Sequence, residues 1–340
     1  MNSKNPPDST PGGKRAPLSL DLPLDTPYLV QMFPCYACNF RCEYCIFAIS
    51  KSERNFISDV VFMDWDLYTR CIDDMKGFNK KLKMLRFAAI GEPLLHPRIS
   101  DMVEYAKSAD IAHSIDIVTN ASKLNPDLSH ELVDAGLGRL RISLEGLSSE
   151  EYKKNAKVDI DFEQFVDNIR YFYEHKKDTF VYIKIIDYMI KTPGREELFH
   201  SVFSDICDAL AIENLTPTIH KIDYYAISGQ SNDRPQNGAC LLDADVCPQG
   251  FYLMQINPDG KVVPCCNMTY PDILGNAQIE NVVEIWNGSK FNDFRIKMLQ
   301  SRAEASLICQ NCLLYRYGLH EEDILDGVKE ELLCKYTNLL

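Results

Sequence analysis

The sequence has no long hydrophobic run and no excess of basic residues. No apolar stretch reaches the roughly 20 residues that a transmembrane helix needs, so we expect no membrane partner. The first residues, MNSKNPPDSTPGGKRAPLS, lack the apolar core of a secretory signal, which favours a cytoplasmic protein. Asp and Glu outnumber Lys and Arg by 49 to 36, and the net charge of −13 argues against nucleic acid as a partner.

Cysteine, by contrast, is abundant. Thirteen cysteines in a reducing compartment indicate metal or redox chemistry rather than disulfides. Cys38, Cys42 and Cys45 have a C-x3-C-x2-C spacing within CNFRCEYC. Three thiolates so close can bind a [4Fe–4S] cluster, which takes four ligands, so one iron stays open to a substrate or cofactor. A zinc knuckle, a redox pair or core thiols would give the same spacing, and Cys35 adds an overlapping C-x2-C.

Strands and helices are predicted to alternate along most of the chain. Six strand–helix units predict a parallel sheet with right-handed crossovers, and they are too few for a closed eight-stranded barrel. We therefore expect an α/β fold with a partial (β/α)6 barrel over residues 25–235, after a mobile tail at 1–24. Strands are expected at 28–33, 84–90, up to 119–120, 139–144, 180–186 and near 216–220, and helices at 63–75, 97–108, 126–135, 162–175 and 195–210.

Polar groups follow four of the expected strands. The cysteine loop follows the first strand, Gly91-Glu92-Pro93 the second, Thr119-Asn120 the third, and Ser143 and Glu145 end the fourth. Because barrel enzymes carry their chemistry at the carboxyl ends of the strands, we expect these groups on one rim. A turn glycine and helix N-caps are the alternative interpretation of each group taken singly.

A second set of cysteines lies in residues 236–340, where we expect a small domain built from a β-hairpin and helices. Two strands, FYLMQI and KVVP, flank a Pro-Asp-Gly turn, which predicts a hairpin that brings Cys247 near Cys265. Cys309 and Cys312 follow as a C-x2-C pair. Four thiolates could ligate another [4Fe–4S] cluster or a ribbon-type zinc ion, and the spacing does not separate the two.

These motifs resemble the radical S-adenosylmethionine (SAM) superfamily. CNFRCEYC resembles its cluster loop, and IGEPLLHP resembles its GGEP motif except at Ile90. C-x12-G-x4-C with the later C-x2-C resembles the SPASM/twitch extension, and is similar to the butirosin-pathway aminocyclitol dehydrogenase and its relatives. The resemblance implies SAM and two [4Fe–4S] clusters, the auxiliary one held by Cys247, Cys265, Cys309 and Cys312. It implies SAM contacts from Tyr44, Gly91, Glu92, Pro93, Thr119, Asn120 and Ser143.

The resemblance also implies a 5′-deoxyadenosyl radical that abstracts a hydrogen atom from a small polar metabolite. We expect oxidation of a secondary alcohol in a sugar or cyclitol to a ketone, with an electron donor such as flavodoxin or ferredoxin. Lys184 is the first candidate for a base or hydrogen-bond donor, followed by Arg141 and His220; an outward-facing or ion-paired lysine is the alternative.

Three other functions stay open. An epimerase could use Cys240 as the hydrogen donor. The substrate could be a ribosomal peptide, although residues 1–24 are too short for a peptide-recognition domain ahead of the barrel. In a different class altogether, the chain could be a zinc-binding or electron-transfer protein without SAM chemistry.

Overall fold

Six parallel strands form an open, partial barrel, as the sequence predicts. The computed structural model describes residues 15–54, 59–88, 90–231, 233–237, 240–267 and 269–339. The strands lie in the order β6-β5-β4-β3-β2-β1, and each pairs in parallel with its neighbours. They are β1 (Leu29–Met32), β2 (Met84–Phe87), β3 (Ile115–Thr119), β4 (Arg139–Leu144), β5 (Phe180–Ile186) and β6 (Ala209–Glu213).

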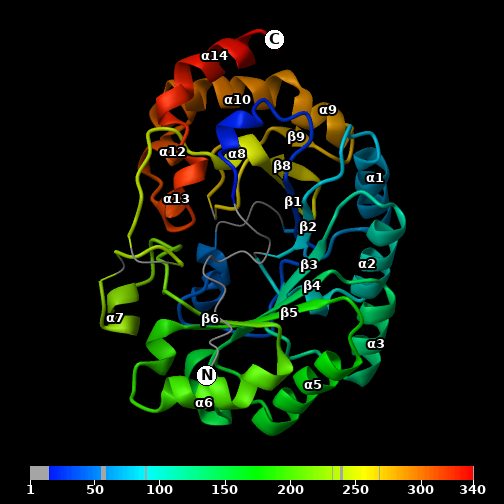
Figure 1. The fold of residues 1–340 in the computed structure, drawn as a ribbon, viewed down its shortest axis with the longest axis vertical. Helices are drawn as coiled ribbons and strands as arrows, with labels where there is room; N and C mark the ends of the chain where they lie inside the picture. The colour runs from blue at the N-terminus through cyan, green and yellow to red at the C-terminus, as the bar shows by residue number, and fades with distance from the viewer. Residues whose placement is uncertain are drawn as a thin grey trace.

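Helices cover the outer face of this sheet, to the right of it and below it in Figure 1. Their apolar stripes pack on the sheet: in α1, for example, Leu67, Cys71 and Ile72 are buried. Asp64 and Asp161 cap α1 and α5 by accepting hydrogen bonds from first-turn N–H groups. The helices are α1 (Trp65–Met75), α2 (Ile99–Ser108), α3 (Pro126–Asp134), α4 (Ser149–Asn155), α5 (Phe162–His175) and α6 (Arg195–Phe203).

The sixth strand lies earlier in the chain than predicted. The expected strand near 216–220 is wrong, and the helix expected to reach residue 210 ends at Phe203. Pro217 has no N–H to give to a strand ladder, whereas Ala209–Glu213 pairs along β5. The correction places Glu213 at the carboxyl end of β6, the position where the other strands carry their polar groups.

The predicted hairpin forms, but it joins the barrel sheet. β7 (Leu253–Ile256) and β8 (Lys261–Val263) are antiparallel, and Gly260 turns between them with φ of +82°. β7 also pairs in parallel with β1, and β9 (Gly275–Asn276) completes a nine-stranded sheet. The remaining helices are α7 (Tyr224–Ser228), α8 (Gln249–Tyr252), α9 (Val282–Asn287), α10 (Ser289–Gln300), α11 (Arg302–Ala305), α12 (Leu307–Asn311), α13 (Leu314–Tyr317) and α14 (Lys329–Thr337).

The chain ahead of β1 packs on the C-terminal helices. Leu18 and Leu22 are buried, and the Trp286 indole N–H of α9 donates to the Leu24 carbonyl over 2.9 Å. Residues 1–14 of the expected tail lie outside the described residues. Among the helices that the structure describes, none is both long and apolar enough to cross a membrane.

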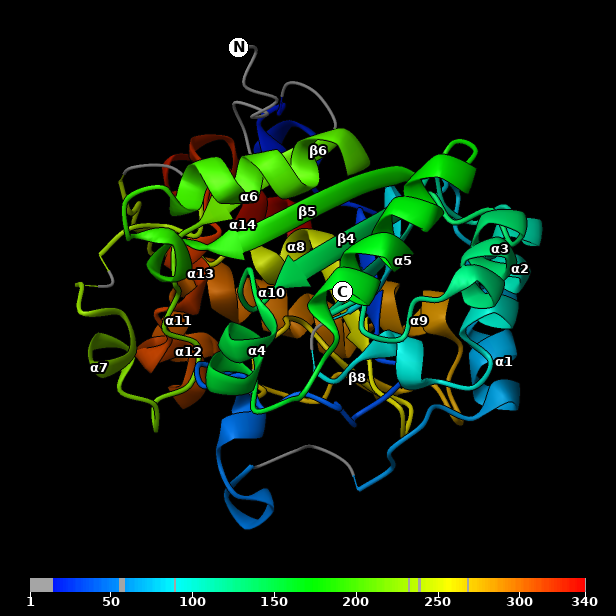
Figure 2. The ribbon, with the colours of Figure 1, turned by 90° about the horizontal axis from the view of Figure 1, so that it is seen from below.

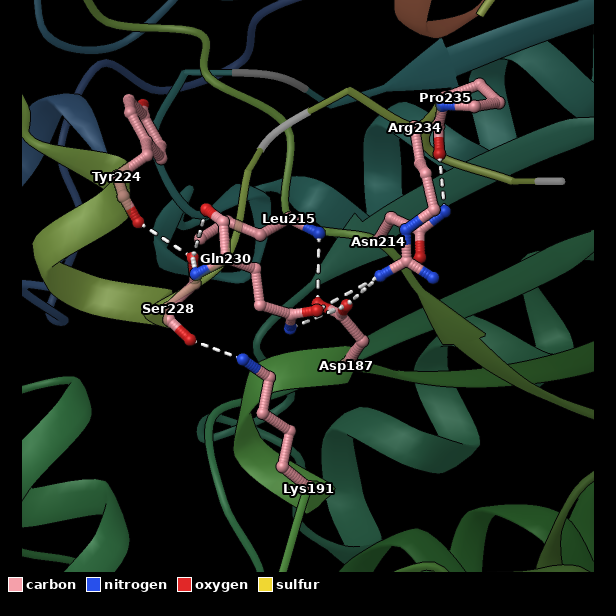
Figure 3. A network of polar contacts seen from close by, with 9 residues as sticks. All are labelled: Asp187, Lys191, Asn214, Leu215, Tyr224, Ser228, Gln230, Arg234 and Pro235. Atoms are coloured by element: carbon pink, nitrogen blue, oxygen red, sulfur yellow. Dashed lines mark hydrogen bonds and ion pairs between the residues drawn. The ribbon is translucent and has the colours of Figure 1, made fainter. Parts of the chain in front are cut away.

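A polar network fixes the segment that leaves β6 (Figure 3). The Asp187 carboxylate, just after β5, accepts from the Leu215 N–H over 3.2 Å and from the Arg234 guanidinium over 3.0 Å. Lys191 donates to the Ser228 carbonyl. The segment is thereby held against the ends of β5 and β6, and it leads to the C-terminal third at residue 236.

Candidate active site

The first cysteine loop is anchored to the end of α4. The Arg41 N–H donates to the Ala156 carbonyl over 2.8 Å, and the Glu43 N–H donates to the Asn155 carbonyl over 3.0 Å. After these two contacts, the Cys45 N–H donates to the Cys42 carbonyl over 2.9 Å and closes a turn. This turn leads directly into the next helical turn of the chain. The loop directly follows β1, so its three thiols lie at the carboxyl ends of the barrel strands.

The three thiols lie close enough for charge on one to raise the pKa of another. Burial raises the pKa of Cys42 well above its usual value, and negative charge on Glu145, Cys45 and Cys38 raises it further. Burial also raises the pKa of Cys38 to about 12, although the Phe40 N–H, 3.4 Å from its sulfur, opposes the shift. Thiolates here need compensating positive charge, which the irons of a cluster supply.

The three thiols of the first loop are not arranged around a single metal ion in the described structure. Within the described ranges, no three Cys, His, Asp or Glu side chains converge closely enough to hold a single metal ion. A tetrahedral zinc ion would bring its thiolates to about 3.8 Å from one another. In a [4Fe–4S] cluster each thiolate binds a different iron, so that degree of convergence is not required.

The turn at Gly91 packs against the chain just before the cysteine loop. Gly91 has φ of +95°, and a Cβ there would lie 2.0 Å from the Cys35 carbonyl oxygen. The Glu92 N–H donates to the Ala37 carbonyl over 2.8 Å. Only glycine fits this close approach, which brings the 91–93 turn beside the loop as the sequence predicts.

The Glu92 carboxylate faces into the protein. It accepts from the Leu94 N–H at 2.9 Å, from the Thr119 hydroxyl at 2.5 Å and from the Asn120 N–H at 2.7 Å. Burial raises the pKa of Glu92 to about 7 against these three hydrogen bonds. The side chain thus joins the ends of β2 and β3, and Pro93 begins a buried helical turn after it.

Asn120 and Tyr44 complete the surroundings of the loop. The Asn120 amide donates to the Asn39 side-chain oxygen at 3.1 Å and lies 3.9 Å from the Cys38 sulfur. The Tyr44 hydroxyl donates to Glu145 at 2.6 Å. Burial raises the pKa of Glu145 to about 7. The sequence placed Glu145 on this rim but did not single it out as a site residue; only the fold turns its carboxylate toward Tyr44 and Cys42.

Lys184 and Arg141 lie on the inner face of the barrel and share one carboxylate. Lys184 forms an ion pair with Glu213, and the Arg141 guanidinium lies 4.0 Å from the same Glu213 carboxylate. The Tyr182 hydroxyl donates to Glu213 at 3.1 Å. Burial alone would raise the pKa of Glu213, but Lys184 and Arg141 lower it below its usual value. The predicted SAM residue Ser143 lies beside Lys184 in the sheet register.

Gln236 links this inner face to the second cysteine set. Its amide donates to Glu213 at 2.7 Å, while its N–H donates to the Tyr317 carbonyl at 2.9 Å. Gln236 also lines a cavity of about 210 Å³ that holds the second cysteine set. Figure 2 shows the arrowheads of β4 and β5 pointing toward the side of the molecule where α11, α12 and α13 lie.

Five cysteines line this cavity, one more than predicted: Cys247, Cys265, Cys266, Cys309 and Cys312. Burial raises the pKa of Cys247 to about 12, and negative charge on Cys309 and Cys312 raises it further. Arg302 lines the same cavity and donates to the Cys312 carbonyl at 3.3 Å. The donor set suits a cluster whose four irons all have protein ligands.

Two further candidates lie elsewhere. Cys240 and His220 are both exposed, and neither has a contact with Lys184 among those found in the described chain. His220 lines a separate cavity with Ile46 and Arg54. Glu213, which the sequence reading missed, occupies the position at Lys184 instead; placing the sixth strand at 209–213 would have revealed it as one more polar strand end.

Comparisons with known proteins agree with this geometry. Residues 32–198 match the family model of the radical SAM superfamily. Residues 247–313 match the model of SPASM, an iron–sulfur cluster-binding domain. The cysteine loop lies in the first match, and the five cavity cysteines lie in the second.

The chain is also similar to individual proteins. It is 25% identical over 296 residues to the tungsten-containing aldehyde ferredoxin oxidoreductase cofactor-modifying protein of Pyrococcus furiosus, covering 76% of this chain and 80% of that one. BtrN in complex with AdoMet and 2-DOIA superposes with a TM-score of 0.54 at 17% identity, over 84% of this chain and 92% of BtrN. Streptococcus suis SuiB bound to precursor peptide SuiA gives 0.60 at 15% identity, over 92% and 77%. At these identities the two structures demonstrate a shared fold.

Proposed function

We propose that this radical SAM enzyme, with a radical SAM domain over residues 32–198 and a SPASM domain over residues 247–313, oxidises a secondary alcohol of a small polar metabolite, such as a sugar or cyclitol, to a ketone. The observation that carries the proposal is the Lys184–Glu213 pair on the inner face of the barrel. The Lys184–Glu213 pair lies on the same sheet whose first strand ends in the cysteine loop. Gln236 donates to Glu213 and also lines the cavity of the second set of cysteines.

The two cysteine sets divide the cofactors between them. A radical SAM domain binds SAM and a [4Fe–4S] cluster, here at Cys38, Cys42 and Cys45, and a SPASM domain binds further clusters. When bound, SAM supplies the 5′-deoxyadenosyl radical that removes a hydrogen atom from the carbinol carbon, and the auxiliary cluster supplies an acceptor for the remaining electron. Four thiolates, from Cys247, Cys265, Cys309 and Cys312, suffice to hold one auxiliary cluster.

Glu213 takes the proton of the substrate hydroxyl. Formation of a carbonyl requires that proton to leave, and a buried carboxylate can accept it. Lys184 contacts Glu213 directly, so the carboxylate rather than the amine is the proton acceptor in this proposal. We therefore assign Lys184 and Arg141 to keeping Glu213 ionised and to donating hydrogen bonds to the substrate oxygen.

The surrounding contacts orient Glu213. Tyr182 donates to one carboxylate oxygen, and Gln236 donates to the other, so the group cannot rotate freely. Burial of the carboxylate, which is 2% exposed, keeps bulk water away from the proton that it receives.

The test uses anaerobically reconstituted protein, a chemical reductant, SAM and a panel of polyols and aminocyclitols. We expect 5′-deoxyadenosine and a ketone in equal amounts with one substrate class. In D2O the product should carry no solvent deuterium at the oxidised carbon. Formation of 5′-deoxyadenosine with deuterium at a retained carbinol carbon would instead establish epimerisation, and the absence of 5′-deoxyadenosine under all conditions would contradict radical chemistry.

Epimerisation is the second candidate, and one observation favours it. The cavity holds five thiols, whereas one cluster takes four. Cys266, beside Arg86 of the inner face, is the thiol left over after the predicted ligands and could return a hydrogen atom to the substrate. Cys240, the donor expected from the sequence, is exposed.

The proposal implies two further conditions. An electron must reach the SAM-binding cluster, and a small acidic carrier such as flavodoxin or ferredoxin is the class of donor that we expect. Oxygen-sensitive clusters and thirteen free cysteines favour a reducing compartment such as the cytoplasm.

A further inference from the structure

Asn267 connects two distant segments that carry the second cysteine set. It follows Cys265 and Cys266 in the chain, after the end of β8. Its side-chain amide donates to the sulfur of Cys312, which directly follows α12, over 3.5 Å. Asn267 lines the cavity of the five cysteines and also the cavity that His220 lines. The amide is therefore part of the wall of the auxiliary site.

A second contact determines which end of the amide faces the sulfur. The Thr269 N–H donates to the Asn267 side-chain oxygen over 3.3 Å. A backbone N–H can only donate and a thiolate can only accept, so the oxygen faces Thr269 and the NH2 group faces Cys312. The contact with Cys312 thus remains a hydrogen bond when the thiol is ionised.

Backbone donors reach two other predicted ligands of this set. A hydrogen bond from the Gln249 N–H opposes the rise in pKa that burial causes at Cys247. The N–H of Asn267 has the same effect at Cys265. Any residue except proline would supply these backbone groups. The donor at Cys312, by contrast, is a side chain, so it depends on having asparagine at this position.

A donor at a cysteine sulfur changes the energy of reducing a cluster. Reduction adds negative charge that the sulfurs share, so an N–H donated to a sulfur stabilises the reduced state more than the oxidised one and raises the reduction potential. The first set differs here. The Asn120 amide donates to Asn39 at 3.1 Å, and its contact with the Cys38 sulfur is longer, at 3.9 Å.

We infer that Asn267 is a positioning residue that raises the reduction potential of the auxiliary cluster through its hydrogen bond to Cys312. The inference rests on the proposed function, in which the substrate radical loses one proton and one electron to become the ketone. The proton goes to Glu213, and the electron goes to the auxiliary cluster. A higher potential of this cluster makes the electron transfer more favourable.

The test is a redox titration of the reconstituted holoprotein without substrate, followed by electron paramagnetic resonance. Asn267→Leu keeps the approximate size of the side chain and removes the donor. We expect the equilibrium constant for reduction of the auxiliary cluster to fall by about tenfold, or about 59 mV for one electron. The SAM-binding cluster should keep its potential. Asn338→Leu is the matched control, since this exposed amide lies 4.0 Å from the sulfur of Cys334, outside both cysteine sets.

An unchanged potential in Asn267→Leu at full iron and sulfide content, or an equal shift in Asn338→Leu, would overturn the inference. If Asn267→Leu binds less iron than the wild type, Asn267→Asp decides at pH 8, because it keeps the shape of the side chain and replaces the donor with a carboxylate. A lower potential in that variant supports the inference, and a potential equal to or above that of the wild type contradicts it.

The wild type is assayed for the ketone in parallel. Absence of the ketone would contradict the proposed function, whereas the potential, measured without substrate, tests the hydrogen bond from Asn267 alone.

Discussion

The two cysteine sets are built in opposite ways. The first is local, since Cys38, Cys42 and Cys45 belong to one loop that two backbone hydrogen bonds fix to the end of α4. The second is assembled from distant segments: Cys247 precedes α8, Cys265 follows β8, and Cys309 lies on α12. A single short loop can supply three ligands and leave an iron open, whereas an assembled cavity can surround a cluster completely.

The charges around the two sets differ as well. The buried carboxyls of Glu92 and Glu145 lie at the first set, and the guanidinium of Arg302 lies at the second. Acidic surroundings suit a cationic cofactor such as SAM, while a nearby cation favours a cluster that accepts an electron. This difference fits the proposed division of roles, in which the first set would bind the SAM-binding cluster and the second an electron-accepting cluster.

Replacing one cysteine of the first set, and separately one cysteine of the second set, should give the largest effects. Cys42→Ala should abolish formation of 5′-deoxyadenosine, because the open cluster loses one of its three ligands. Cys309→Ala should keep SAM cleavage and lose the ketone. Chromatography of both products checks this, with the exposed Cys334→Ala as the control. Equal loss of SAM cleavage in the two variants would contradict the division of roles.

Glu213→Gln should separate SAM cleavage, which continues, from ketone formation, which falls. We expect ketone formation to fall by roughly 10² to 10⁴, the usual contribution of a general base, while 5′-deoxyadenosine still forms. Lys184→Ala should lower the ketone yield less, since Arg141 still pairs with Glu213. The exposed Glu163→Gln is the matched control. Lys184→Ala activity at the wild-type rate would remove Lys184 from the mechanism.

The Glu92 carboxyl should make the free energy of unfolding depend on pH. Its pKa of about 7 lies above the usual 4.5, so the folded protein binds this proton more tightly than the unfolded chain does. The stabilisation is fully present below pH 4.5 and is lost as pH rises through 7, in total on the order of 3 kcal/mol. Glu92→Gln should remove this part of the pH dependence.

Urea unfolding at pH 5 and pH 8, followed by circular dichroism, measures the effect. The wild type should lose more stability between these two conditions than Glu92→Gln does. Glu145 keeps its own contribution in both proteins, so the variant's profile flattens only in part. Identical pH dependence of the two proteins would show that the Glu92 carboxyl is not buried as described.

Arg302→Gln should have the smallest effect, confined to the second site. Loss of a cation beside the auxiliary cluster should lower its reduction potential by about 50 mV, equivalent to about 1 kcal/mol for one electron. The potential of the SAM-binding cluster should stay unchanged. A redox titration followed by electron paramagnetic resonance separates the two clusters, and Arg302→Lys should restore most of the difference. Equal shifts in both clusters would contradict the assignment of Arg302.

Much of this organisation could be predicted because its signals are local. The bounds of β4, β5 and α5 match the residues expected from apolar periodicity. The cysteine loop and the turn at Gly91 meet because both end neighbouring parallel strands. Where Pro217 interrupts an apolar run, the strand was predicted too late and Glu213 was missed.

The remaining features depend on contacts between distant segments. Nothing in the spacing of FYLMQI shows that it pairs with β1 rather than closing a separate domain. The sequence also does not show that Cys266 lies near Arg86, or that two arginines share Asp116, because those contacts arise only when neighbouring strands pair in the sheet.

The most direct test of the two-site account is electron paramagnetic resonance of the reduced protein with and without SAM. The account predicts two cluster signals, of which SAM changes one. The responsive signal should be missing in Cys42→Ala and retained in Cys309→Ala. A SAM-dependent change that survives in Cys42→Ala, or that disappears in Cys309→Ala alone, would contradict the assignment of the open cluster to Cys38, Cys42 and Cys45.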